Sequence, residues 1–201
     1  NDFSIEIEAN TVHAIVGPNG SGKTSLLRIL TGLYDKDDGE VKVKGNHAML
    51  LENDYLYEDK TGLENIKIYG LYFGYEAKNY EKHSDLLEIT NDLNRNVSTY
   101  SKGMKRKLSL LIIVMMNRDI IFLDEVTSGV DPISRVEIRK LIRLLKDEGK
   151  SIIITSHDLA EIEKAADRVS MIKSGELLFT KNISEIYGES LEELFIEEGL
   201  K

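Results

Sequence analysis

Apolar positions recur along the chain in two patterns that predict strands. Phe3, Ile5 and Ile7 alternate with polar neighbours, which is the period of a half-buried strand. The runs IIFL at 120–123 and SIIIT at 151–155 are continuously apolar, so helices are expected on both faces of that part of the sheet. The other predicted strands are 12–16, 48–51 and 168–172, with an exposed strand and turn at 39–46.

Helices are predicted between these strands from their start and stop signals. TGLE at 61–64 has the form of a capping box, so a helix is expected to begin there. Asp131-Pro132 and Gly149 bound another helix, with proline at its first position and glycine just past its end. Further helices are predicted at about 23–31, 79–90, 102–117 and 158–166. Because strands and helices alternate, we predict an α/β fold with a mainly parallel sheet and a small helical insertion at 61–99.

Composition narrows the class of protein. The 201 residues include 35 acidic and 26 basic side chains, for a formal net charge of -9, which disfavours nucleic acid and anionic lipid as partners. There is no cysteine, so disulfide and thiolate chemistry are excluded. The longest apolar run, 108–116, is far short of the ~20 residues that span a bilayer. The beginning of the chain lacks the basic start of a signal peptide. We therefore expect a soluble, cytoplasmic protein.

One short segment runs against this acidic balance. Residues 100–108 read YSKGMKRKL, with four Lys or Arg among nine residues, directly before the apolar run SLLIIVMM. A nucleic-acid patch, a membrane-surface anchor, a solvated helix start and a phosphate-binding loop are all compatible with this pattern.

A glycine-rich loop follows the strand at 12–16. GPNGSGKTS at 17–25 matches G-x-x-x-x-G-K-[ST], in which backbone N–H groups and a helix N-terminus surround a phosphate. In this pattern Lys23 reaches the β- and γ-phosphates and the Thr24 hydroxyl ligates Mg²⁺. An ordinary glycine-rich turn is the alternative, but the strand before the loop and the helix after it favour a nucleoside triphosphate site. The candidate nucleotide-binding residues are Gly17, Pro18, Asn19, Gly20, Ser21, Gly22, Lys23, Thr24 and Ser25.

Two carboxylates follow the predicted strand at 120–123. Asp124 stands at the carboxyl end of this strand, where α/β proteins bind ligands, and a carboxylate there can hold Mg²⁺. Glu125 beside it can polarise a water for attack on the γ-phosphate. The alternative is that both residues simply begin a loop. Given the phosphate-binding loop, we predict a catalytic pair.

Two further polar residues have plausible structural roles as well. Asp131 precedes a proline and is a good helix N-cap, and it can also be an interface residue. His157 follows the strand at 151–155, where its imidazole can hydrogen-bond a γ-phosphate. Alternatively His157 is an exposed residue in a helix's first turn, capped by Ser156 or Asp158. Its position after a core strand, downstream of the other motifs, favours the functional role.

Together these motifs resemble the ATP-binding cassette family over nearly the whole chain. GPNGSGKTS resembles its Walker A and IIFLDE its Walker B, TSGVD resembles the D-loop, and ITSHD the histidine switch. YSKGM resembles the family signature and lies between Walker A and Walker B, as in the family.

The resemblance implies a domain organisation and a mode of action. It implies a P-loop NTPase core with a small antiparallel β portion at 1–52 and 118–201, and a helical subdomain with the signature at about 53–117. It also implies ATP and Mg²⁺, a head-to-tail dimer with a second ATPase subunit, and an integral-membrane permease powered by hydrolysis. The chain would then lie on the inner face of the cell membrane through that permease.

The family's residue roles transfer by position. Residues 20–25 hold phosphates, Thr24 and Asp124 hold Mg²⁺, and Lys23, Glu125 and His157 act on the triphosphate. Ser101, Lys102 and Gly103 contact the ATP of the other subunit, and Asp131 belongs to the D-loop.

Several positions depart from the family pattern. Glu52 aligns with the Q-loop glutamine, and Val126 replaces the proline after the catalytic glutamate. Lys102 replaces the first signature glycine and Met104 replaces the signature glutamine. The form YSKGM is frequent in the branch of the family that exports drugs, antibiotics and polysaccharides. A C-terminal segment like SLEELF at 190–195 is also frequent in that branch. The adenine-stacking aromatic and the first strand are expected before Asn1, and Phe3 is expected in the core.

Three function classes remain: the ATPase subunit of a transporter, a soluble cassette ATPase acting on translation or DNA, and a regulatory cassette without turnover. Glu125 and the acidic charge favour the first, and the resemblance of YSKGM and SLEELF to the exporting branch favours an exporter. Lys105, Arg106 and Lys107 are expected to face solvent or acidic neighbours.

Overall fold

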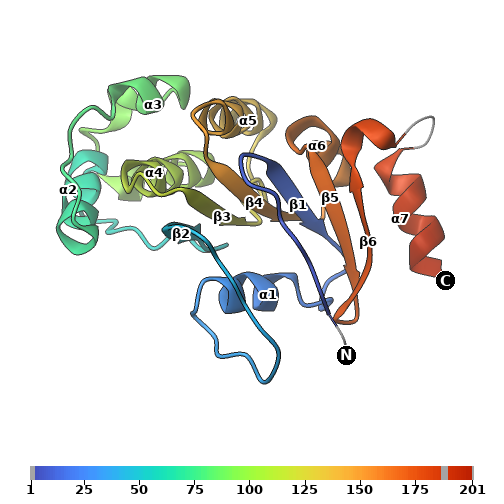
Figure 1. Ribbon diagram of the computed structural model, residues 1–201. Helices are drawn as coiled ribbons and strands as arrows, with labels where there is room; N and C mark the ends of the chain where they lie inside the picture. The colour runs from blue at the N-terminus through green and yellow to red at the C-terminus, as the bar shows by residue number, and fades with distance from the viewer. Residues whose placement is uncertain (1–2, 187–189, 201) are drawn as a thin grey trace.

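A six-stranded sheet forms the centre of the computed structural model, which describes residues 3–186 and 190–200 (Figure 1). The strand order is β2-β3-β4-β1-β5-β6, and only the β5–β6 pair is antiparallel. The strands are β1 (Val12–Val16), β2 (His47–Leu50), β3 (Ile120–Asp124), β4 (Ser151–Ser156), β5 (Arg168–Lys173) and β6 (Glu176–Asn182). This confirms the predicted α/β fold with a mainly parallel sheet.

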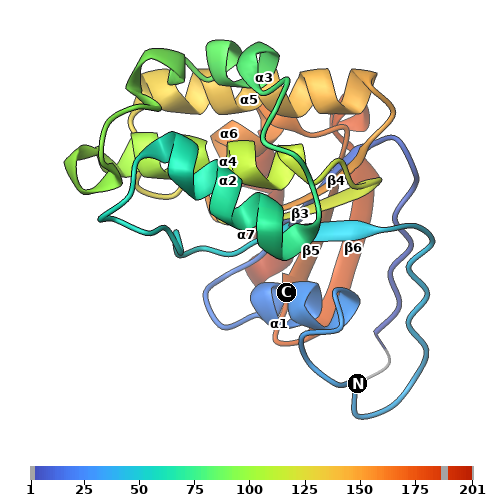
Figure 2. The ribbon, with the colours of Figure 1, turned by 90° about the vertical axis from the view of Figure 1, so that its left-hand side faces the viewer.

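Helices cover both faces of the sheet, as the continuously apolar strands predicted. The α-helices are α1 (Lys23–Leu30), α2 (Gly62–Phe73), α3 (Glu81–Leu86), α4 (Lys102–Met115), α5 (Pro132–Asp147), α6 (Leu159–Ala165) and α7 (Leu191–Leu200). Short 3₁₀ helices lie at Thr90–Asp92, Val97–Thr99 and Ile183–Glu185. Figure 1 shows α1 on one face of the sheet and α4 and α5 on the other. Figure 2 shows α2 in front of α4, with α3 beside α5.

Alternate apolar residues of β1 to β5 enter two separate apolar clusters. Ile121 and Leu123 of β3 pack in the large cluster with α4 and α5, while Phe122 packs in the smaller one with Leu27 of α1. Phe3 packs against the smaller cluster, as expected for a core residue. This alternation places the side chains of the strands in two buried layers.

The capping signals predict the helix starts well. Thr61 and Glu64 form the predicted capping box at the start of α2. The Asp131 side chain accepts hydrogen bonds from the first turn of α5, whose first residue is Pro132. Because these signals satisfy the free N–H groups of a first helical turn, they can be identified without tertiary information.

Two predicted strands are wrong. Residues 3–7 and 39–46 have no strand partner in the described part of the chain, and the side chains at 39–42 are exposed. A strand needs a neighbour for its backbone hydrogen bonds, which an alternating pattern alone does not supply. The antiparallel portion of the sheet is instead the hairpin of β5 and β6, and β6 was not predicted.

The predicted helix at 79–90 is also too long. α3 covers only Glu81–Leu86, because Asn79 and Glu88 on either side have φ of 58° and 53°. Left-handed residues of this kind end a right-handed helix.

Within residues 3–186 and 190–200, no helix combines the length and apolar character needed to cross a membrane.

Candidate functional site

The loop between β1 and α1 has the backbone that a phosphate-binding loop requires. Gly20 and Gly22 have φ of 79° and 105°, in the left-handed region that favours glycine. A Cβ built on either glycine meets no atom within 4 Å, so both glycines face open space. Ser21 between them is buried, and its hydroxyl has no hydrogen-bond partner among the described residues. Gly20 and Gly22 thus leave the loop backbone open to a ligand, whereas the Ser21 hydroxyl is enclosed by the protein.

Lys23 is held at the edge of this loop. Its side chain is buried, and its Nζ donates to the carbonyl oxygens of Gly17 at 2.8 Å and Pro18 at 3.1 Å. Burial lowers the pKa of Lys23 from its usual value, while Glu125 and Asp124 act in the opposite direction. The ammonium group therefore lies in a partly desolvated position near two carboxylates, where a phosphate would be a strong partner.

The buried Asp124 carboxylate ends β3. Its Oδ1 accepts hydrogen bonds from Thr155 Oγ1 at 2.6 Å and Thr24 Oγ1 at 3.2 Å. Asp124 and Thr155 are register partners on the adjacent parallel strands β3 and β4. The sheet thus brings the predicted metal ligands Thr24 and Asp124 into contact, although they are far apart in the sequence.

Glu125 and His157 form a second contact at the same edge of the sheet. Glu125 has φ of 50°, which is uncommon for a residue other than glycine, and its N–H donates to Thr155 Oγ1 at 3.1 Å. Its Oε2 lies 2.9 Å from His157 Nδ1. Because an ionised carboxylate only accepts, the proton of this bond is on Nδ1. Most of the His157 side chain is exposed (61%), against 14% for Glu125, so the imidazole has room to move.

Lys23, Thr24, Glu125 and His157 line one pocket of about 360 Å³. Its lining residues are Asn19, Gly20, Gly22, Lys23, Thr24, Ser25, Glu52, Glu125, Ser128 and His157. A volume of this size fits a small-molecule ligand. A second pocket of about 290 Å³ adjoins it and is lined by Gly17, Pro18, Asn19, His157, Leu159 and Phe195. The structure thus brings part of the glycine-rich loop, Glu52, Glu125 and His157 together in one pocket.

Four predicted site residues lie at the N-terminal ends of α4 and α5. Ser101, Lys102, Gly103 and Asp131 are absent from the described lining of the 360 Å³ pocket. Ser101 caps α4 and accepts from Met104 N–H at 3.2 Å. Asp131 caps α5 and accepts from Ser134 Oγ at 2.7 Å, and the hydrogen bonds from Ser134 lower the pKa of its carboxyl. Their structural roles as caps are established by these contacts.

Lys102 and Gly103 pack closely against the segment before α5. A Cβ on Gly129 would collide with Lys102 Nζ, and a Cβ on Gly103 would lie 2.8 Å from Asp131 Oδ2. The start of α4 and the loop after Glu125 are therefore in direct contact.

The remaining basic residues of the segment pair with acidic neighbours. Lys105 binds Glu58 at the surface, whereas Lys107 and Glu137 form an ion pair in which both side chains are buried. Arg106 is also buried, and its guanidinium lies 3.3 Å from Asp54. The sequence predicted that Lys105, Arg106 and Lys107 face solvent or acidic neighbours, and each of them has an acidic partner. Arg106 and Lys107 are buried with these partners.

Sequence reasoning missed two residues of the site. Thr155 joins Asp124 to the backbone of Glu125, and Ser128 lines the pocket. The signal for Thr155 was a polar residue at the end of the apolar run SIIIT, directly before Ser156 and His157.

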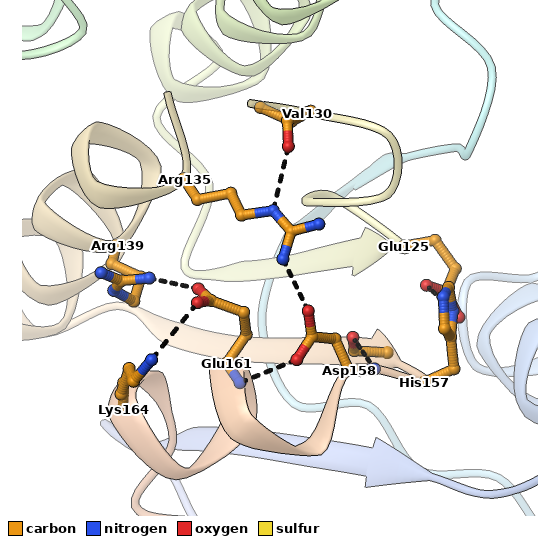
Figure 3. A network of polar contacts seen from close by, with 9 residues as sticks. Glu125, Val130, Arg135, Arg139, His157, Asp158, Glu161 and Lys164 are labelled. Atoms are coloured by element: carbon orange, nitrogen blue, oxygen red, sulfur yellow. Dashed lines mark hydrogen bonds and ion pairs between the residues drawn. The ribbon is translucent and has the colours of Figure 1, made fainter. Parts of the chain in front are cut away.

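An arginine network also connects the two loops of the site and was missed (Figure 3). Arg135 donates from Nε to the Val130 carbonyl at 3.0 Å and from Nη1 to Asp158 Oδ2 at 2.6 Å. Figure 3 shows this arginine between the loop after Glu125 and the residue after His157. Arg135 therefore ties together the loops that carry the Glu125–His157 contact.

The donor groups also fit a magnesium ion. Among the described residues, no three His, Asp or Glu side chains converge as in an all-protein metal centre. Mg²⁺ is commonly held by one or two protein oxygens together with substrate phosphates. The Thr24 hydroxyl and the Asp124 carboxylate supply oxygens of this kind at the edge of the loop.

A family model and several curated proteins match most of this chain. A family model described as "ABC transporter" matches residues 1–128. The "Lantibiotic transport ATP-binding protein SrtF" of Streptococcus pyogenes is 32% identical over 204 residues, covering 97% of this chain and 88% of that protein. The "Daunorubicin resistance ATP-binding protein DrrA3" of Streptomyces coeruleorubidus is 30% identical over 204 residues, covering 94% of this chain and 65% of that protein.

Solved structures support the same fold. The "Structure of ATP binding subunit of ABC transporter" has a TM-score of 0.87 at 22% identity and covers 98% of this chain and 92% of that chain. The "Dimeric structure of a post-hydrolysis state of the ATP-binding cassette MJ0796 bound to ADP and Pi" has a TM-score of 0.80 at 21% identity, covering 90% and 89%.

Proposed function

The chain belongs to the ABC transporter family as an ATP-binding ATPase subunit, and from this premise we propose how its residues bind and hydrolyse ATP. The observation that carries the proposal is the single pocket shared by the glycine-rich loop, Lys23, Glu125 and His157. Residues 17–25 hold the phosphates through backbone N–H groups, the Ser25 hydroxyl and the Lys23 ammonium.

Thr24 and Asp124 hold Mg²⁺ in this proposal. The ion neutralises charge on the phosphate oxygens when bound. Thr155 keeps the Asp124 carboxylate oriented toward Thr24, because its hydroxyl donates to the same oxygen. Such a second partner fixes the geometry of a metal ligand.

Glu125 is the proposed general base. Its carboxylate accepts a proton from the attacking water, in line with the γ-phosphate. In the structure this carboxylate accepts a hydrogen bond from His157. We propose that His157 exchanges this contact for the γ-phosphate when ATP binds, which leaves Glu125 free to accept the proton of water.

A second copy of the chain is proposed to complete the site. Ser101, Lys102 and Gly103 lie at the start of the 14-residue helix α4, apart from the pocket of their own chain. The free N–H groups and the dipole at that end favour an anion. In a head-to-tail dimer they would contact the γ-phosphate of the partner's ATP, with Asp131 near the interface.

The ATPase is also proposed to act on a membrane partner in a particular direction of transport. We propose that the chain drives an integral-membrane permease in the export direction, from the inner face of the cell membrane. The relatives named for lantibiotic transport and daunorubicin resistance support this direction. The division into a core at 1–52 and 118–201 and a helical subdomain at 53–117 is part of the same proposal, as is a contribution of Glu52 to the metal site.

Glu125→Gln tests the proposed base. It should lower the steady-state rate of ATP hydrolysis by at least 100-fold, because the amide cannot accept the proton, while ATP affinity stays within about threefold. Glu81→Gln, on the exposed surface of α3, is the matched control and should keep the full rate. Hydrolysis by Glu125→Gln at the rate of the unmodified chain would exclude Glu125 as the base.

A further inference from the structure

Among the described residues, Arg106 is the largest fully buried one that the proposed mechanism leaves unused. It lies in α4, five residues after Ser101, and its side chain is 1% exposed. A buried guanidinium carries a large desolvation cost unless its donors are satisfied. Its contacts therefore show what this charge does in the molecule.

The guanidinium holds the chain segment that leaves β2. Arg106 Nη1 donates to the Leu51 carbonyl at 2.8 Å, and Nη2 donates to the Glu52 carbonyl. Nη1 also lies 3.3 Å from the Asp54 carboxylate, which is itself only 11% exposed. The planar fork of arginine thus contacts three groups within four residues of this irregular segment.

Glu52 is the member of this segment that lines the pocket. Its neighbours in the lining include Thr24 and Glu125, so it adds a carboxylate to the region where Asp124 also lies. Carboxylates that share a pocket repel one another. Burial lowers the pKa of Arg106, and Asp54, Glu52 and Asp124 oppose this shift in that order. The arginine therefore interacts electrostatically with both Glu52 and Asp124.

We propose that Arg106 is a positioning residue for ATP turnover. It fixes the backbone of residues 51–54, so that Glu52 keeps its place in the pocket, and its positive charge offsets the carboxylate that Glu52 adds there. Arg106 does not touch the triphosphate in this proposal, and it acts through the backbone of residues 51–54 and through Glu52. The inference rests on the proposed function, since it assigns Arg106 to the same ATP site.

The proposal distinguishes the shape of the side chain from its charge. Arg106→Lys keeps the charge but has no planar fork, and it cannot hold two carbonyls and a carboxylate in the same way. Arg106→Gln removes the charge as well. The matched control is Lys105→Gln, which removes the same charge from the neighbouring position, where the partner is the exposed Glu58.

Kinetics in two backgrounds provide the test. With Mg²⁺ and ATP, Arg106→Gln should lower kcat at least 10-fold, and Arg106→Lys should lower it less. Lys105→Gln should stay within twofold. In a Glu52→Gln background, the further loss caused by Arg106→Gln should shrink to threefold or less, because the carboxylate it offsets is gone. A purely structural role would give the same loss in both backgrounds, and that result would overturn the proposal, as would a kcat within twofold for Arg106→Gln.

A second measurement applies if Arg106→Gln folds poorly. Amide hydrogen exchange at residues 51–54 should accelerate at least fivefold in Arg106→Lys and remain unchanged in Lys105→Gln. Equal exchange in both variants would overturn the proposal. Glu125→Gln, measured alongside, distinguishes failure of the Arg106 proposal from failure of the proposed ATPase site. If Glu125→Gln abolishes turnover while the Arg106 variants hydrolyse ATP normally, the proposed ATPase site is retained and only the role of Arg106 is rejected.

Discussion

His13 is an imidazole enclosed by the central sheet. It lies on β1 and is fully buried, with Nε2 2.7 Å from Ser170 Oγ and Nδ1 without a partner among the described residues. Burial, and secondarily the charge of Arg168, lowers the pKa of His13 to about 4. The neutral form is therefore strongly favoured in the folded protein.

This burial makes stability depend on pH. In the unfolded chain the pKa of His13 is near its usual 6.5, so between pH 6.5 and 4 the unfolded state binds the proton and the folded state does not. The free energy of unfolding should therefore fall as the pH decreases through this range, by about 3 kcal/mol in total. Urea denaturation at a series of pH values measures this loss.

His13→Gln is the control for that experiment, because glutamine does not titrate. Carboxylates also titrate in the lower part of this range, so the difference between the two chains isolates His13. The variant should lose less stability than the unmodified chain between pH 6.5 and 4. Parallel stability curves would show that His13 has an ordinary pKa.

At the level of single residues, sequence motifs identified residues that line the pocket, but they did not identify the contacts between side chains. The loop residues and Glu125 were predicted because a motif specifies residue type and spacing. The Lys107–Glu137 pair was not, because it depends on how α4 and α5 pack. Thr155 was missed for the same reason, since its role arises from the register of β3 and β4.

At the level of elements, α4 and the start of α5 approach closely through Gly103. A Cβ there would lie 2.8 Å from Asp131 Oδ2 and 2.9 Å from Ser134 Oγ, two atoms that hydrogen-bond to each other. Ser134 is buried, so this contact has little room to adjust. Glycine therefore permits both the helix contact and the cap of α5.

Gly103→Ala should destabilise the protein. Alanine favours a helix over glycine by about 1 kcal/mol, but a clash in a packed contact typically costs about 1–3 kcal/mol, so we expect a net loss of about 1 kcal/mol. Thermal unfolding measures it. The control is Lys105→Ala on the same helix, where only a surface ion pair is lost and the change should be at most about 1 kcal/mol. A stabilised Gly103→Ala protein would contradict the packing described for α4 and α5.

The elements themselves were predicted where local signals are strong. Capping residues define α2 and α5, and continuous apolar runs define β3 and β4. The pattern at 3–7 predicted a strand wrongly, because an alternating pattern does not say whether a neighbouring strand is available. β6 was missed because six of its seven residues are half-buried, without the alternation that identifies an edge strand.

At the scale of the whole molecule, one chain holds two parts of the proposed ATP site in different places. The pocket with Lys23 and Glu125 lies at the carboxyl ends of the strands, while Ser101 caps α4 outside it. If both parts bind one triphosphate, they must come from two chains. ATP should therefore link two copies, and hydrolysis should separate them.

The most direct measurement is the mass of the Glu125→Gln chain in solution, by light scattering coupled to gel filtration. With ATP and Mg²⁺ it should double from one chain to two, since the trapped ATP holds both copies, and without ATP it should stay at one. Adding Ser101→Arg should keep the mass at that of one chain while ATP still binds. The larger side chain blocks the proposed contact between the start of α4 and the ATP of the other copy. A single chain for Glu125→Gln with saturating ATP, or undiminished pairing with Ser101→Arg, would contradict an ATP shared between two copies.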